Sequence, residues 1–314
     1  MRWLVRITFR QHQFEIVALG ALLALSAVGL LVIPVIWSML PIAECTAAGS
    51  LAPEDVTAEL IRRCTVTFDT IRVVEGIGQA LVIAGVAGPA VAGVILGAGL
   101  VSKEIERGTA VMPWTMGRSR RRWLLERMLV IGVLLGGFSL ALAALTDNLM
   151  FMFDQTPLDR SLYLYEVRGW MVPARGMVGL AAGVLAGAIL GRAVPALLVG
   201  ALVASLCSMG VYDFGNELNR AQAIEYDDPG GLYISEILRD HTGAIVSYDE
   251  AYARISVEDD ASWARFQAEF RSSSIGVPGP ESRIVTGREV LMLVGLAFVM
   301  TTGAVVVVER RRPY

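Results

Sequence analysis

One densely charged stretch joins two long apolar segments of this sequence. The stretch runs from Gly97 to Thr109 and reads Gly-Ala-Gly-Leu-Val-Ser-Lys-Glu-Ile-Glu-Arg-Gly-Thr. A basic run, Arg118-Ser-Arg-Arg-Arg-Trp123, follows closely. Carboxylates and guanidinium groups on a short turn are suited to charge-assisted contacts with a complementary surface. The chemistry that these residues indicate is recognition of a partner.

This sequence contains no motif typical of hydrolytic enzymes or of metal sites. Its two histidines, His12 and His241, are predicted on opposite sides of a membrane, so no H-E-x-x-H pair exists. There is no G-x-S-x-G elbow and no C-x-x-C pair. Lys103 is the single lysine, and it lacks the glycine pattern of a P-loop. We therefore predict that the chain is not an enzyme, holds no metal and binds no cofactor, and that any ATP and Mg would be bound by a separate subunit.

The elements that position the charged stretch are predicted to be membrane-spanning helices. Hydrophobic residues make up 54% of the 314 residues, charged residues 18%, and the mean hydropathy is +0.56. About 20 helical residues cross the hydrocarbon layer, and the period-two alternation of a membrane barrel is absent. Six segments are long and apolar enough: Phe14–Met39, Ile77–Val101, Met128–Leu145, Trp170–Leu190, Ala193–Val211 and Val290–Val308. The sequence thus predicts an all-α polytopic membrane protein with six transmembrane helices.

The distribution of arginine predicts the orientation of these helices. Cytoplasmic loops carry an excess of Arg and Lys. The basic residues of one side are Arg2, Arg6, Arg10, Lys103, Arg107, Arg118, Arg120, Arg121, Arg122, Arg127, Arg192, Arg310, Arg311 and Arg312. We therefore expect both termini in the cytoplasm, in agreement with an even number of spans.

The predicted spans divide the chain into four parts. These are a cytoplasmic segment 1–13, spans one to five over 14–211 with an external loop 40–76 and a cytoplasmic loop 102–127, an external cap 212–288, and the sixth span with a basic tail, 289–314. The first part suits an amphipathic helix on the inner membrane surface, and a simple basic topology signal explains its arginines equally well.

Each of the two external segments contains a predicted helix. Pro53-Glu54-Asp55 followed by Val56–Cys64 predicts a short capped helix. Val257–Phe270 has the spacing of a helix with its aromatic side chains along one face. Since no strong core is evident in 212–288, we expect a cap packed on the membrane domain instead of an independent domain.

Two of the three cysteines lie in the same external loop. An oxidising exterior would let Cys45 and Cys64 form a disulfide, while the alternative is two free thiols. Cys207 lies inside the fifth predicted span and is expected to be a small packed hydrophobic residue.

Small residues recur at the spacing of helix packing. The glycines of the fourth span are Gly179, Gly183, Gly187 and Gly191, and similar pairs are Gly93 with Gly97 and Gly132 with Gly136. Such faces let helix backbones approach closely, so these positions predict tight contacts between spans.

Three polar residues near the predicted external ends of spans are candidates for a gate or a transport pathway. They are Gln79, Arg175 and Glu289. Ionisable residues within spans often mark pathways, but near an interface their side chains can snorkel to water. Since the middles of the spans are almost wholly apolar, an amphipathic or lipophilic substrate suits such a pathway better than an ion.

The charged motif resembles that of ABC-2 type transporter permeases, and most closely those of the actinobacterial type. These carry G-A-x-L-V-x-x-E-x-E-x-G-T and then R-x-R-W-L between the second and third spans, which correspond here to Gly97–Thr109 and Arg120–Leu124. They also carry W-x-x-x-R-Q-H near the start, whereas Trp3 precedes Arg10-Gln11-His12 here at a longer spacing. Arg127 stands where the family usually has lysine. The layout of six spans with a large external insert before the sixth is similar over nearly the whole chain.

The resemblance implies a six-helix ABC-2 architecture (ABCG-like, type V exporter) in a bacterial plasma membrane. It implies that Ser102–Thr109 is a coupling helix seated on an ABC nucleotide-binding (ATPase) subunit, with Glu104 and Glu106 facing basic groups there and Gly108 ending the helix. The basic loop of Arg118, Arg120, Arg121 and Arg122 would contact lipid head groups and the ATPase. Topology and anionic lipid also account for these arginines, but not for the two glutamates.

The function implied is that of the permease subunit of an ATP-driven exporter, paired with a second copy or a paralogue. One alternative is a non-transporting membrane scaffold or sensor that uses 212–288. Another is a secondary carrier, but that class usually places ionisable groups near the midplane, where these spans have none. Membrane lipid is an expected partner, and nucleic acid is not.

Overall fold

The computed structural model describes residues 13–48, 57–106, 119–153, 162, 165–226, 230–256 and 260–311. The chain divides into two compact units. The helical unit comprises residues 1–153, 166–208 and 290–314, and the sheet unit comprises residues 154–165 and 209–289. The predicted N-terminal segment lies almost entirely outside the described residues.

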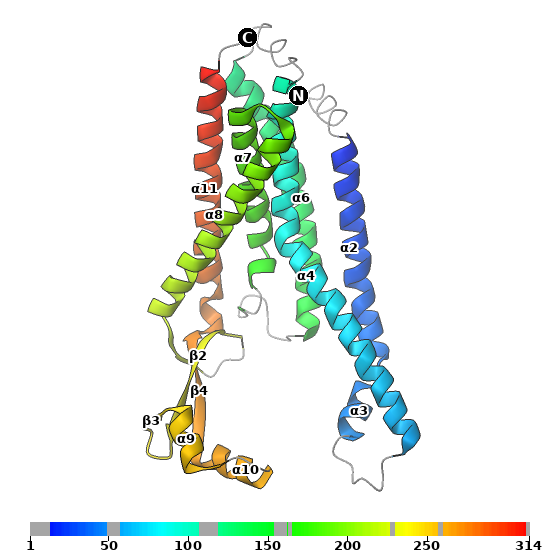
Figure 1. The fold of residues 1–314 in the computed structure, drawn as a ribbon, viewed down its shortest axis with the longest axis vertical. Helices are drawn as coiled ribbons and strands as arrows, with labels where there is room; N and C mark the ends of the chain where they lie inside the picture. The colour runs from blue at the N-terminus through cyan, green and yellow to red at the C-terminus, as the bar shows by residue number, and fades with distance from the viewer. Residues whose placement is uncertain are drawn as a thin grey trace. The chain divides into compact units, whose positions relative to one another are not determined.

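Long helices dominate the fold (Figure 1). The helices are α2 (Gln13–Met39), α3 (Ile42–Ala48), α4 (Ala58–Glu106), α6 (Arg120–Phe153), α7 (Met171–Leu190), α8 (Ala193–Ala221) and α11 (Ser282–Arg310), with a 3-10 turn at Tyr165–Val167. Six of the described helices, all but α3 of this group, are long and apolar enough to cross a membrane. Each predicted span coincides with one of them to within one residue or lies inside it, so the prediction of six transmembrane helices is confirmed.

Helix α4 differs from the prediction of a short helix followed by a separate span. It is one continuous helix of 49 residues, drawn without a break in Figure 1. At 1.5 Å per residue it is about 74 Å long, more than twice the roughly 30 Å of the hydrocarbon core. No glycine or proline interrupts Ala58–Glu75, which is why the helix continues. Its first turn is capped by Thr57, whose Oγ1 accepts from the Leu60 amide at 3.2 Å; Pro53-Glu54-Asp55 lies outside the described residues.

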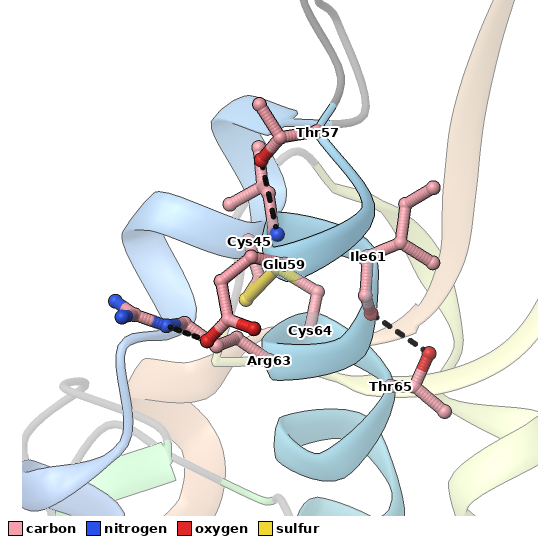
Figure 2. The surroundings of a disulfide bond; sticks show 8 residues. Cys45, Thr57, Glu59, Ile61, Arg63, Cys64 and Thr65 are labelled. Carbon is pink, nitrogen blue, oxygen red and sulfur yellow. Dashed lines mark hydrogen bonds and ion pairs between the residues drawn. A yellow bond between two sulfur atoms is a disulfide. The ribbon is translucent and has the colours of Figure 1, made fainter.

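A disulfide joins α3 to the first turns of α4. The Cα atoms of Cys45 and Cys64 are 5.3 Å apart, and both residues are buried (Figure 2). Nearby on α4, Glu59 accepts hydrogen bonds from Arg62 and Arg63 at about 3.0 Å. The predicted pairing is therefore present in the structure, and it fixes the short helix α3 against the end of α4.

Replacing Cys45 by serine is expected to lower the free energy of unfolding by about 3 kcal/mol, because the bridge closes a loop of about 20 residues. Thermal unfolding of the purified chain in detergent measures the loss. Cys207→Ser is the matched control, since Cys207 is the free cysteine of the described chain. Equal unfolding temperatures for the two variants would contradict the prediction.

The glycines of α4 and α7 bring these two helices into backbone contact. A Cβ on Gly179 would lie 2.1 Å from the carbonyl oxygen of Ala90, and a Cβ on Gly93 would lie 2.3 Å from that of Gly176. The same holds for Gly183 against Val94 at 2.6 Å. The absence of side chains is therefore what permits this packing.

Three other predicted glycines behave differently. Gly191 has φ +64° and ends α7, where its amide donates to the Gly187 carbonyl oxygen. A Cβ on Gly132 or Gly136 would meet only the side chains of Leu180 and Met177, at 3.4 Å or more. The prediction of a close helix contact at Gly132 and Gly136 is therefore wrong within this chain, because the facing helix α7 presents side chains there.

The sheet unit contains an antiparallel sheet that the sequence did not suggest. Its strands are β1 (Ile224–Tyr226), β2 (Leu232–Asp240), β3 (Ile245–Val246) and β4 (Phe270–Val277), in the order β1-β4-β2-β3. Helices α9 (Tyr248–Arg254) and α10 (Asp260–Glu269) and a 3-10 turn (Gly279–Glu281) complete the unit. The serine-rich strand β4 lacks the apolar-polar alternation that predicts strands. The all-α description thus holds for the spans, and the insert carries the sheet.

The sheet unit also has a hydrophobic core of its own. Its buried members are Leu238, Val246, Ala251, Phe266 and Phe270. The expectation that this segment lacks a core is therefore wrong. The aromatic face was predicted correctly for Phe266, but helix α10 ends at Glu269 and Phe270 begins β4. The predicted limits of 212–288 also take in the end of α8 and the start of α11.

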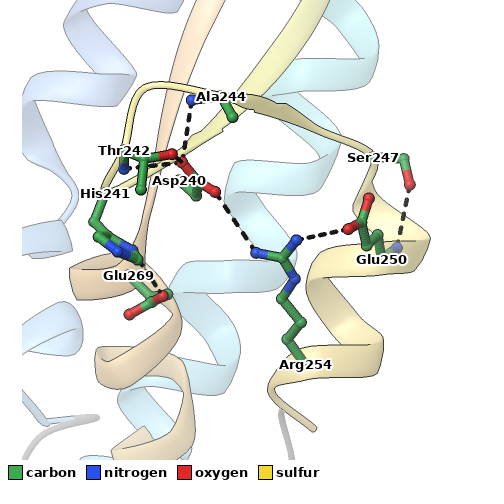
Figure 3. A network of polar contacts seen from close by, with 8 residues as sticks. All are labelled: Asp240, His241, Thr242, Ala244, Ser247, Glu250, Arg254 and Glu269. Atoms are coloured by element: carbon green, nitrogen blue, oxygen red, sulfur yellow. Dashed lines mark hydrogen bonds and ion pairs between the residues drawn. The ribbon is translucent and has the colours of Figure 1, made fainter.

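A carboxylate organises the turn between β2 and β3 (Figure 3). Asp240 accepts hydrogen bonds from the Thr242 hydroxyl and amide and from the Ala244 amide, and its other oxygen lies 3.6 Å from the Arg254 guanidinium. The hydrogen bond of the Thr242 hydroxyl first, and then those of the Ala244 and Thr242 amides, lower the pKa of Asp240. The ionised form is therefore the one that stabilises the folded turn.

Acidification is expected to loosen this turn. A carboxyl group with a lowered pKa in the folded state contributes stability above its unfolded pKa, and this is lost as the pH falls through the folded value. Hydrogen exchange of the Thr242 and Ala244 amides, corrected for intrinsic rates, should show protection that falls as the carboxyl protonates. Asp240→Asn should remove this pH dependence and Asp213→Asn, on α8, should retain it; a pH dependence unchanged in Asp240→Asn would contradict the assignment.

Candidate functional site

The charged motif places an ion pair between α4 and α6. Glu104, in the last turn of α4, pairs with Arg127 of α6, and the two side chains are 14% and 9% exposed. The Arg127 guanidinium also lies 4.8 Å from the ring centroid of Trp123, over the indole face. A buried, charge-assisted pair of this kind holds the two helices together because separating it leaves an uncompensated charge.

Three further polar contacts join helix ends in the same part of the helical unit. The Glu106 carboxylate accepts from the Ala193 amide at 3.3 Å, which is one of the amides that the start of α8 leaves without an intrahelical partner. The Arg311 guanidinium donates to the Ala188 carbonyl oxygen at 2.6 Å, near the end of α7. Arg120 of α6 donates to the carbonyl oxygen of Arg311.

Together these contacts form what we call the basic-end cluster, consisting of Glu104, Glu106, Arg120, Arg127, Ala193 and Arg311. It links the ends of α4, α6, α7, α8 and the chain after α11. The sequence singled out Glu104, Glu106 and Arg120, whereas the roles of Arg127 and Arg311 were missed. Their positions at helix ends were the available signal, but which helix ends meet is a property of the fold.

The predicted coupling segment is the end of α4 as far as the structure describes it. Ser102 is fully buried and its hydroxyl donates to the Ala98 carbonyl oxygen at 2.5 Å. Lys103 is half-buried and Glu106 is exposed. The expectation that Glu104 faces a partner subunit is corrected, since its carboxylate pairs with Arg127 of the same chain. Arg107, Gly108, Thr109 and Arg118 lie outside the described residues.

The arginines of the predicted basic loop also differ from one another in their contacts. Arg120 is bound to the chain after α11, and Arg122 forms an exposed ion pair with Glu126 at 2.9 Å. Arg121 is exposed. These three arginines therefore present different surfaces, and Arg121 is the one that points to solvent or lipid.

Two further buried ion pairs of the helical unit lie near the end of α6 and the start of α7. Arg175 lies 3.8 Å from Glu166, and Arg168 lies 3.2 Å from Asp147. The arginine side chains are 8% and 6% exposed. This burial contradicts the snorkelling alternative for Arg175. Glu166, Arg168 and Asp147 were not predicted as members of these pairs, although Asp147 stands at the end of an apolar run, where an ionisable group is a signal by itself.

Glu289 is buried as well, within the sheet unit. It is 1% exposed and accepts a hydrogen bond from the Tyr165 hydroxyl at 2.9 Å. A Cβ on Gly215 would lie 2.5 Å from its Oε1. Gln79 is exposed on α4. Arg175 and Glu289 each have a partner within their own unit, and Gln79 lies on a surface of α4.

Within the described part of the chain, no group of three or more histidine, cysteine, aspartate or glutamate residues is arranged to hold a metal ion. The polar contacts described above all join one part of the protein to another. Their arrangement suits the transmission of movement between helices.

The chain matches a family model over more than half of its length. Residues 16–213 match the family described as ABC-2 membrane transporter related, a range that takes in α2, α4, α6, α7 and most of α8. No curated protein and no solved structure gives a significant match. The six apolar helices and the charged end of α4 agree with this assignment. The chain therefore belongs to the ABC-2 membrane transporter related family, and it is a multi-pass permease component of an ABC transporter.

Proposed function

We propose that this permease is the transmembrane subunit of an ATP-driven exporter that carries an amphipathic or lipophilic substrate across the bacterial plasma membrane. The observation that supports this proposal best is the basic-end cluster, in which the last turn of α4 is tied to α6 and α8. ATP and Mg would be bound by a separate nucleotide-binding subunit, and the basic ends of the helices would face the cytoplasm together with both termini.

The coupling step follows from the contacts of Glu104 and Glu106. When the ATPase closes, it would press on the segment Ser102–Thr109. The Glu104–Arg127 pair would pass this movement to α6, and the Glu106 contact with Ala193 would pass it to α8. Among the described residues of the segment, Glu106 is the exposed one and is therefore available to a partner.

The buried pairs near the other end of the helical unit suit a gate. Arg175 with Glu166 and Arg168 with Asp147 neutralise one another, so they attract no ion but hold the ends of α6 and α7 together. Opening the gate would exchange these ion pairs for contacts with water or substrate. A second copy or a paralogue would supply the other half of the pathway, as the family resemblance implies.

Copurification in mild detergent tests the proposal. The wild-type chain is expected to bring down an ATPase subunit whose activity rises in the complex. Glu106→Gln keeps an acceptor for the Ala193 amide but removes the charge, and it is expected to uncouple this ATPase while the chain stays folded. Glu75→Gln, an exposed charge near the middle of the same helix, is the matched control. If no ATPase copurifies from conditions that keep the permease oligomer intact, the proposal fails.

A ligand sensor is the second candidate, and one observation favours it. Tyr252 and Trp263 of the sheet unit are 45% and 44% exposed, and each stacks on Phe266 with ring centroids 5.1 and 5.5 Å apart. Exposed stacked rings are a surface on which apolar or cationic ligands bind. A chain that binds a ligand through this surface and recruits no ATPase would establish this alternative.

A further inference from the structure

An apolar groove opens on the helical unit between α6, α7 and α11. Its volume is about 600 Å³. Gly132 and Gly136 of α6 and Met177 of α7 are among the residues at its floor, and Leu129 and Phe298 stand at its sides, 58% and 71% exposed. The two glycines are the pair that makes no close helix contact within the chain. The groove thus exists because side chains are missing from α6 where no other helix fills the space.

The dimensions of the groove favour a single alkyl chain as its occupant. The lining residues of α6 run from Leu125 to Leu140, a rise of about 22 Å along the helix. Spread over that length, the volume gives a mean cross-section of about 27 Å². A helix is about 10–12 Å in diameter and needs roughly 80–110 Å², whereas an alkyl chain with carbon contacts near 4 Å needs on the order of 20 Å².

A cationic side chain stands at one end of the groove. Arg121 lies four residues before Leu125, so the two share a face of α6, and Arg121 is exposed. No polar contact is found for its guanidinium within the described residues. Arg121 precedes Gly132 by about 16 Å along the helix axis, close to the half of the roughly 30 Å hydrocarbon core that an acyl chain spans in one leaflet. A lipid whose tail ends near Gly132 therefore has its head group at Arg121.

We propose that this groove binds one anionic phospholipid from the leaflet at the basic ends of the helices. One acyl chain lies along α6 as far as Gly132, and the phosphate pairs with Arg121. Such a lipid fills the space that the glycines leave and holds α6 and α11 at a fixed separation. The proposal is independent of the direction of transport and of the identity of its substrate.

Native mass spectrometry of the full chain in detergent tests the proposal, with phosphatidylglycerol and phosphatidylcholine of identical acyl chains as the added lipids. We expect one retained phosphatidylglycerol per chain and weaker retention of phosphatidylcholine. Arg121→Gln should weaken the retention of phosphatidylglycerol about five-fold, the value of one cation near a membrane surface. Arg192→Gln removes an exposed arginine between α7 and α8 and should leave retention unchanged.

A second substitution tests the acyl-chain site. Gly132→Leu should abolish retention of the lipid, because a Cβ there meets only the Leu180 and Met177 side chains at 3.7 Å and the rest of the leucine enters the groove. Gly295→Leu is the control. A Cβ on Gly295 of α11 would meet no atom within 4 Å, and Gly295 does not line the groove. Equal retention of the two lipids, or equal effects of Arg121→Gln and Arg192→Gln, would overturn the proposal. So would a Gly132→Leu chain that keeps its lipid but dissociates from a second copy, which would make the groove a protein interface.

Discussion

Replacing Gly179 by alanine is expected to separate α4 from α7 and to destabilise the helical unit by about 3 kcal/mol or more. The added methyl group would lie 2.1 Å from the Ala90 carbonyl oxygen and 2.9 Å from its Cα. These are backbone atoms of a continuous helix, so no side chain can rotate to make room. Overpacking in a well-packed core typically costs about 1–3 kcal/mol, and a contact with rigid backbone belongs at the upper end of that range.

Thermal unfolding in detergent, followed by the fraction of monodisperse protein, measures this effect. Gly137→Ala is the matched control, because a Cβ at Gly137 has nothing within 4 Å. Both substitutions add one methyl group to a transmembrane helix and raise helix propensity equally. Similar unfolding temperatures for the two variants would show that α4 and α7 do not approach as closely as the structure indicates.

Replacing Glu104 by alanine is the second substitution for which we expect a large effect. It leaves the buried Arg127 guanidinium without its carboxylate, which typically costs about 3–5 kcal/mol. In the transport complex the same variant is expected to uncouple ATP hydrolysis from movement of α6, because the ion pair is the contact between the coupling segment and that helix. Stability is measured by thermal unfolding, and coupling by the ATPase activity of the copurified complex.

Two comparisons separate the ion pair from general effects of charge. Exchange of the two residues, Glu104→Arg with Arg127→Glu, should recover part of the lost stability, and the lost contact of Arg127 with Trp123 limits the recovery. Arg122→Gln breaks the pair with Glu126, in which the arginine is 72% exposed; such surface pairs contribute about 0–1 kcal/mol. A loss as small in Glu104→Ala as in Arg122→Gln would refute a structural role for the buried pair.

Several features of this protein were determined by local properties of the sequence. Apolar runs near 20 residues long must form helices in a membrane because their backbone polar groups find no water there, and all six predicted runs are helical. Cys45 and Cys64 were predictable as a pair because they share one predicted external loop. The charged end of α4 was visible from the sequence alone, since it is a dense group of charges directly beside a long apolar run.

Only the tertiary structure decided which of the repeated or charged residues meet. Gly93 and Gly179 face each other across α4 and α7, whereas Gly132 and Gly136, with the same spacing, face side chains and line a groove. Glu104 finds Arg127 inside the chain, and Arg175 is buried against Glu166. Spacing along one helix determines which residues share a face, but the rotation of that helix against its neighbours determines what the face contacts. That rotation is set by the packing of all the helices together and is not encoded in any single segment.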